Sequence, residues 1–241
     1  MKLDRQFSVN LVPTTALFAV LLGAVGLRAQ EAAASPETHD HSQHGGKVIR
    51  LERDLEVRLA LNALPKDLRD AATVFALEDQ GYVKVRQGKN PFTCIVSRRG
   101  GNFYPVCFDE EGTRTILKAF IDDAVFRLKG LSDEEIDRQI ADGFAQGRYQ
   151  PAARPGIAYM LSPATYMLNG GKLVRTPAHV MFYAPFLTNA DIGGIMGKTA
   201  FVDRPGPHGM IIVVAGQKER EALLTESQSL VDEVERRIGV K

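Results

Sequence analysis

Hydrophobic and polar positions alternate along this chain with two periods, one typical of strands and one typical of helices. Short apolar runs bounded by Gly or Pro predict β-strands near Thr73–Leu77 and Tyr82–Arg86. The second half adds three further runs, IAYMLS, HVMFYAPF and GMIIVVAG. Because these three are apolar almost throughout, we expect central strands that are covered on both faces.

Three longer segments carry the helical period. Thr113–Lys129 places its apolar residues on one face and ends at Gly130. Ser132 and Glu135 form a capping box that opens a second helix. Gln217–Ile238 is amphipathic and predicts a third helix with an apolar stripe that faces the core.

The segment that follows Val48 is open to two interpretations. Its alternation over Leu55–Leu61 favours a half-buried strand, whereas Leu51, Leu55 and Leu59 would also line one face of a helix. With this segment left open, the pattern predicts an α+β fold: an antiparallel or mixed sheet with about three packed helices.

A β-hairpin is predicted within Pro91–Glu110, the stretch that holds both cysteines of the chain. If Gly100 and Gly101 form a two-residue turn, Cys94 lies directly opposite Cys107 in a non-hydrogen-bonded pair, with Cα atoms about 4.5 Å apart. That spacing permits a disulfide. Pro105 cannot donate a backbone hydrogen bond, so we expect the second strand to be an edge near this residue.

The alternative for the cysteines is two free thiols, one of them a nucleophile paired with a distant histidine. The compartment decides between the two states, and the N-terminus predicts the compartment. Lys2 and Arg5 precede an apolar core at Ala16–Leu27, the layout of a signal peptide over residues 1–29. Cleavage is expected before Gln30 or among Ala32–Ala34.

An exported protein meets an oxidising environment, which favours the Cys94–Cys107 disulfide. We therefore expect a bacterial periplasmic or secreted protein without an integral membrane segment after cleavage. Residues 30–47 are polar and rich in Ala, Ser and Gly, and they predict a disordered linker. Residues 48–241 then form a single globular α+β domain.

Charge narrows the range of partners. The 30 Lys and Arg residues nearly balance 29 Asp and Glu, which argues against nucleic acid or an anionic membrane as the main partner.

Two groups of histidines are candidates for a functional site. The linker carries His39, His41 and His44, and imidazole suits a divalent transition metal. The alternative is a polar tail in which histidines are simply tolerated.

The second group consists of His179 and His208, each of which begins a predicted strand. If these strands are parallel neighbours, the two histidines meet at one end of the sheet beside a loop that contains Asp191. Such a group could bind a metal or move a proton. The alternative is that both histidines are only surface or packing residues.

The segments ATVFAL, NPFTC, YPVCFDEEG, PGIAYML and PHGMIIV together resemble an uncharacterised group of exported bacterial proteins. The resemblance covers roughly residues 60–215. It implies export and a compact domain, and it carries no activity.

Three functions are compatible with these features. The first is binding of a small molecule or metal ion by an exported domain, because the sequence contains no complete catalytic motif. The second is a metal-dependent or His/Asp-based hydrolase that uses His179, His208 and Asp191. The third is a structural envelope protein without a site.

Overall fold

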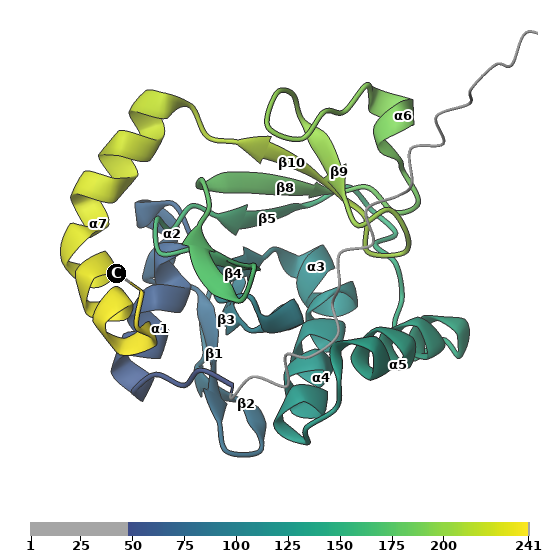
Figure 1. Cartoon of the computed structure of the whole chain (residues 1–241), viewed down its shortest axis with the longest axis horizontal. Helices are drawn as coiled ribbons and strands as arrows, with labels where there is room; N and C mark the ends of the chain where they lie inside the picture. The colour runs from purple at the N-terminus through teal and green to yellow at the C-terminus, as the bar shows by residue number, and fades with distance from the viewer. Residues whose placement is uncertain (1–47, 241) are drawn as a thin grey trace, which may run out of the picture. The chain divides into compact units, whose positions relative to one another are not determined.

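The computed structural model of the protein describes residues 48–240 (Figure 1). Its main feature is an eight-stranded sheet with the strand order β2-β1-β3-β4-β5-β8-β10-β9. The strands are β1 (Thr73–Glu78), β2 (Gly81–Arg86), β3 (Thr93–Ser97), β4 (Tyr104–Phe108), β5 (Ile157–Met160), β8 (His179–Tyr183), β9 (Phe201–Asp203) and β10 (Met210–Val214).

Strand pairing in this sheet is antiparallel except between β1 and β3, which are parallel. A separate two-stranded hairpin consists of β6 (Tyr166–Asn169) and β7 (Lys172–Arg175), and a single bridge from Tyr166 to Phe103 joins it to the β3–β4 turn. The sheet is therefore mixed, as the α+β prediction allowed.

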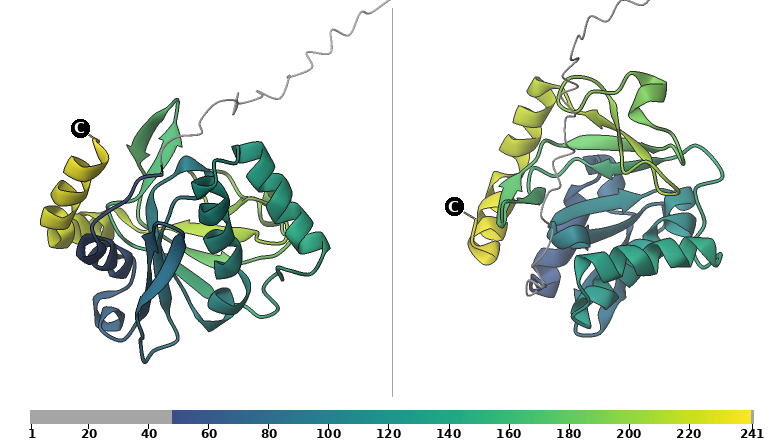
Figure 2. Two further views of the ribbon diagram at one scale, coloured as in Figure 1. Left: turned by 90° about the horizontal axis from the view of Figure 1, so that it is seen from below. Right: turned by 45° about the vertical axis from the view of Figure 1, so that its right-hand side comes forward.

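Helices cover both faces of the sheet (Figures 1 and 2). Cys94 and Val96 of β3 point toward α1 and α7, whereas Ile95 between them packs with residues of α3 and α4. This alternation explains why every residue of β3 is buried. The helices are α1 (Arg53–Asn62), α2 (Lys66–Arg69), α3 (Glu110–Thr115), α4 (Leu117–Leu128), α5 (Asp133–Ala145), α6 (Asn189–Ile192) and α7 (Gln217–Ile238).

The predicted hairpin is confirmed, including its register. Cys94 pairs with Cys107 across β3 and β4, and the two residues form a disulfide with Cα atoms 4.0 Å apart. Gly100 and Gly101 have φ values of 62° and 72°, the left-handed conformation that a tight hairpin turn requires. The disulfide indicates an oxidising compartment.

The expectation of an edge strand at Pro105 holds only locally. Strand β4 lies inside the sheet, between β3 and β5. Its pairing with β5 involves Cys107 and Phe108 and does not extend to Pro105, so the missing N–H removes no bond of that ladder.

Tertiary packing resolves the segment after Val48 as helix α1. Leu55, Leu59 and Asn62 are buried, a spacing of four and three residues that matches one helical face. Val57 and Leu61, which a strand would have placed beside them, are only half-buried.

The other helix predictions hold with one change of boundaries. The capping box of Ser132 and Glu135 opens α5, and α7 spans Gln217–Ile238 as predicted. The expected helix at Thr113–Lys129 is split into α3 and α4 and begins earlier, because the Asp109 side chain accepts the N–H of Gly112 and caps α3.

No helix within residues 48–240 combines the length and hydrophobicity needed to cross a membrane. The predicted signal peptide, the linker and His39, His41 and His44 lie outside the described residues.

Candidate functional site

The structure places His179 at the start of β8, where it is buried. Its Nδ1 lies 2.8 Å from the carbonyl oxygen of Pro177, and burial lowers the pKa of the ring. The adjacent backbone carbonyl gives this histidine a structural partner, in agreement with the packing alternative.

His208 precedes β10 and lies far from His179. Strands β8 and β10 are neighbours, but they are antiparallel, with His179 opposite Val214 and Tyr183 opposite Met210. The two histidines are therefore at opposite ends of the strand pair. The four-residue step from His179 to Tyr183 alone spans roughly 13 Å at about 3.3 Å per residue.

Asp191 has local hydrogen-bond partners of its own. Its Oδ2 accepts hydrogen bonds from the backbone N–H and the hydroxyl of Thr188, 2.8 and 2.6 Å away, which lower the pKa of the carboxyl group. Asp191 caps the short helix α6, so His179, His208 and Asp191 do not form a shared site.

Residues 48–240 contain no group of three or more His, Cys, Asp or Glu side chains arranged to hold a metal ion. In this part of the chain, the hydrolase and metal hypotheses therefore lose the constellation on which they depended.

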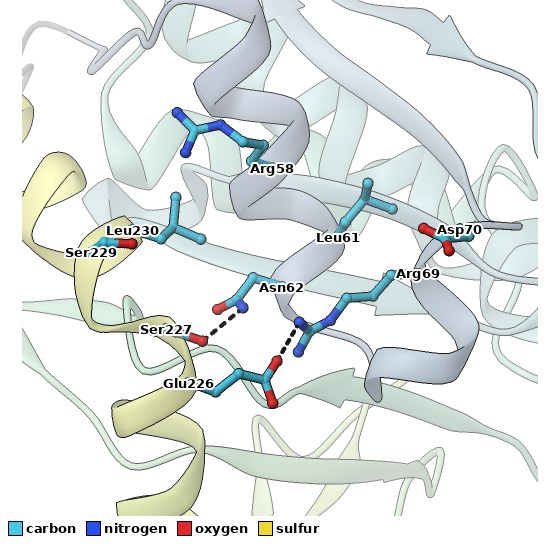
Figure 3. A pocket seen from close by; sticks show the side chains of 9 residues that line it. All are labelled: Arg58, Leu61, Asn62, Arg69, Asp70, Glu226, Ser227, Ser229 and Leu230. Carbon is cyan, nitrogen blue, oxygen red and sulfur yellow. Dashed lines mark hydrogen bonds and ion pairs between the residues drawn. The ribbon is translucent and has the colours of Figure 1, made fainter.

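An open groove lies between α1, α2 and α7 (Figure 3). It holds about 310 Å³, which is within the range of small-molecule pockets. Its lining combines polar and charged side chains with two leucines: Arg58, Leu61, Asn62, Arg69, Asp70, Glu226, Ser227, Ser229 and Leu230.

The arginines of the groove pair with glutamates of α7. Arg69 donates to Glu226 over 2.7 Å and to the carbonyl oxygen of Leu64 over 2.9 Å. Arg58 donates to both carboxylate oxygens of Glu233, 2.8 and 2.9 Å away. These pairs neutralise the guanidinium groups, so the groove does not attract anions.

Asn62 is the most unusual residue of the groove. It is 6% exposed, and its Nδ2 donates to the hydroxyl of Ser227 over 2.9 Å (Figure 3). Its Oδ1 is buried and accepts no hydrogen bond from the described residues. Native proteins rarely leave a buried acceptor without a partner, and doing so costs about 1–3 kcal/mol.

Sequence reasoning missed this groove, although a signal was present. Asn62 continues the apolar stripe of Leu55 and Leu59, and Ser227 interrupts the stripe between Leu223 and Val231 on α7. A polar residue inside an apolar stripe on each of two helices indicates that the two side chains meet.

Comparisons with protein-family models, with curated proteins and with solved structures found no match for this chain.

Proposed function

We propose that the protein is an exported bacterial protein that binds a small molecule in the groove between α1, α2 and α7. The observation that carries the proposal is the unpartnered Oδ1 of the buried Asn62. Because this oxygen is buried, a ligand reaches it only when the side chains around it move. A hydrogen bond from the ligand then removes the cost of leaving the oxygen unpaired.

The lining narrows the chemistry of the ligand. Asp70 and Ser229 accept no side-chain hydrogen bond from the described residues, and they add acceptors to the lining of the groove. Leu61 and Leu230 offer apolar contact. The groove therefore suits a small molecule that carries hydroxyl or amine donors on an apolar frame, and it disfavours a carboxylate or phosphate.

Ligand binding is tested with a panel of polyols, sugars, amines and dicarboxylates, measured by NMR titration and thermal stabilisation. We expect hydroxyl or amine compounds to bind and dicarboxylates to fail. Asn62→Leu removes the acceptor and should weaken binding by at least about tenfold, the equivalent of about 1.4 kcal/mol.

Thr225→Ala is the control outside the groove. The Thr225 hydroxyl donates to the carbonyl oxygen of Glu221 on α7 over 2.9 Å and does not line the groove, so binding should persist in this variant. Unchanged binding to Asn62→Leu would reject the site, and no binding by any compound would favour a structural protein without a site.

A further inference from the structure

A second group of polar side chains lies where the β3–β4 turn meets the loop between β9 and β10. The turn carries Arg99, and the loop carries Arg204. A Cβ atom placed on Gly100 would lie 3.4 Å from Nη2 of Arg204, so the Arg204 guanidinium reaches the turn. Burial and the nearby charge of Arg204 both lower the pKa of Arg99.

Neither guanidinium group has a hydrogen-bond acceptor among the described residues, and Arg204 is exposed to water. The Arg99 side chain is 12% exposed and lies over the ring of Phe120, 5.1 Å from its centroid. Its Nε is 3.9 Å from Oδ2 of Asp123, which is too long for a hydrogen bond. Within residues 48–240 neither the Arg99 nor the Arg204 guanidinium donates a hydrogen bond.

The nearby carboxylates offset the two positive charges only in part. Buried Asp123 forms ion pairs with both Arg99 and Arg127, and its Oδ1 accepts no hydrogen bond from the described residues. Asp123 lies 3.5 Å from Nε of Arg127, and Asp133 lies 2.7 Å from Nη1 of the same arginine. Asp137, whose charge also acts on Arg99, is exposed on α5. Within residues 48–240, the carboxylate paired with Arg99 is thus shared with Arg127, and no carboxylate forms an ion pair with Arg204.

His208 adds an independent indication. It is 7% exposed, and neither Nδ1 nor Nε2 has a hydrogen-bond partner in the described part of the chain. Its ring packs against the edge of Phe144, with centroids 4.3 Å apart. Burial and the Arg99 charge lower the pKa of His208 to about 3, so the ring is neutral at neutral pH and keeps one N–H donor.

The backbone of the loop is unusual at the same place. Arg204 has a φ of 49°, a left-handed conformation that non-glycine residues rarely adopt. Strained backbone of this kind is concentrated at binding and catalytic sites.

From these observations we infer a binding site for a small oxyanion, the carboxylate or phosphate group of a ligand, held between Arg99 and Arg204, with His208 near Arg99. A guanidinium group presents paired donors that match such oxygens. The site is separate from the groove, whose arginines are already paired with glutamates.

The experiment titrates the full-length exported protein with inorganic phosphate, acetate and citrate at constant ionic strength set with chloride. Thermal unfolding and the NMR signals of the Arg99 Nε–H group and the His208 ring report binding. If only phosphate stabilises the protein and shifts these signals, the site binds phosphate. If only acetate or citrate does so, the site binds a carboxylate.

Arg204→Asn removes the charge but keeps a residue that tolerates the left-handed backbone. We expect anion affinity to fall at least tenfold, while the melting temperature without anion rises because the repulsion with Arg99 is relieved. Lys198→Gln, which removes an exposed charge from the preceding loop, should bind the anion like the wild type.

Three results would overturn the inference: no stabilisation of the wild type by any of the anions, equal stabilisation of Arg204→Asn, or an equal loss in Lys198→Gln. The last would show general screening of positive charge rather than a site.

Discussion

At the scale of single residues, the buried polar groups of this domain are of two kinds. Within residues 48–240, Asn62 and His208 keep atoms without a hydrogen-bond partner, as do Asp123, Arg127 and Asp133. Arg98 and Glu56 are instead paired with each other. Their side chains are 3% and 1% exposed and are joined by two hydrogen bonds of 2.5 and 2.6 Å. Arg98 also donates to the carbonyl oxygen of Ile49 over 3.0 Å. Complete pairing of this kind stabilises the fold, whereas the unpartnered atoms of Asn62 and His208 support the two proposed sites.

Replacing Glu56 by Gln leaves the Arg98 charge buried without a counterion. Because an uncompensated buried charge is costly, we expect the free energy of unfolding to fall by about 3–5 kcal/mol, measured by urea denaturation. The control is Glu78→Gln, which breaks the ion pair between Glu78 and Arg53. These side chains are 38% and 64% exposed, so the free energy of unfolding should fall by less than about 1 kcal/mol. Similar losses in the two variants would contradict the structural role given to Glu56.

At the scale of elements, the β3–β4 hairpin shows how local and tertiary information combine. Its turn and the facing cysteines follow from the residues of the hairpin alone, because a two-residue turn determines which residues are opposite. The neighbours of the hairpin do not follow from it. The parallel pairing of β1 with β3 and the antiparallel pairing of β5 with β4 place the hairpin inside the sheet.

The disulfide of this hairpin should contribute measurably to stability. Cys94 and Cys107 are separated by 13 residues, and closing a loop of this size contributes about 3 kcal/mol in the chain-entropy model. We expect the double variant Cys94→Ala and Cys107→Ala to lose at least about that amount, measured by urea denaturation. Reductant should destabilise the wild type and leave the double variant unchanged.

Finding two free thiols in protein recovered from an oxidising compartment would contradict both the disulfide and the stability difference.

At the scale of the whole molecule, one buried carboxylate ties the helical layer to the chain that returns to the sheet. Glu111 of α3 accepts the backbone N–H of Ala153 over 2.6 Å and also hydrogen bonds from Arg114 and Arg154, 2.8 and 3.3 Å away. Burial alone would raise the pKa of Glu111, but these donors outweigh burial and lower it to about 2.

A lowered pKa predicts how stability depends on pH. Glu111 stabilises the fold fully above its ordinary pKa of 4.5, and this stabilisation is lost as the pH falls toward about 2. We expect Glu111→Gln to be less stable at neutral pH and to lose less stability than the wild type between these values. Urea denaturation across the pH range measures both curves.

His208 acts in a higher pH range and serves as the internal control. Its pKa is lowered from 6.5 to about 3, so protonation opposes folding as soon as the pH falls below 6.5. As the pH falls from 6.5 to about 4.5, the stability of Glu111→Gln should therefore decline as much as that of the wild type. If the stabilities of the wild type and Glu111→Gln fell in parallel below about pH 4.5, the role of Glu111 would be contradicted.

The candidate sites could be predicted from the sequence only in part. His208 was identified as a candidate because it begins a strand, but its expected partners were His179 and Asp191. In the structure, the His208 ring packs against Phe144 instead, and the nearby charge of Arg99 helps to lower its pKa. The direction of β10 relative to β8 decides this difference, and no local pattern specifies that direction.

The sequence by itself determined the α+β class, the register of the hairpin, the Ser132 capping box and the amphipathic helix α7. Each of these depends on residues that are close together along the chain. Only the tertiary structure decided the strand order, the antiparallel β8–β10 pair and the helical state of α1. It also decided the contact between Asn62 and Ser227, which are 165 residues apart. Such contacts form because distant apolar faces are buried together, and their geometry is not encoded in either segment alone.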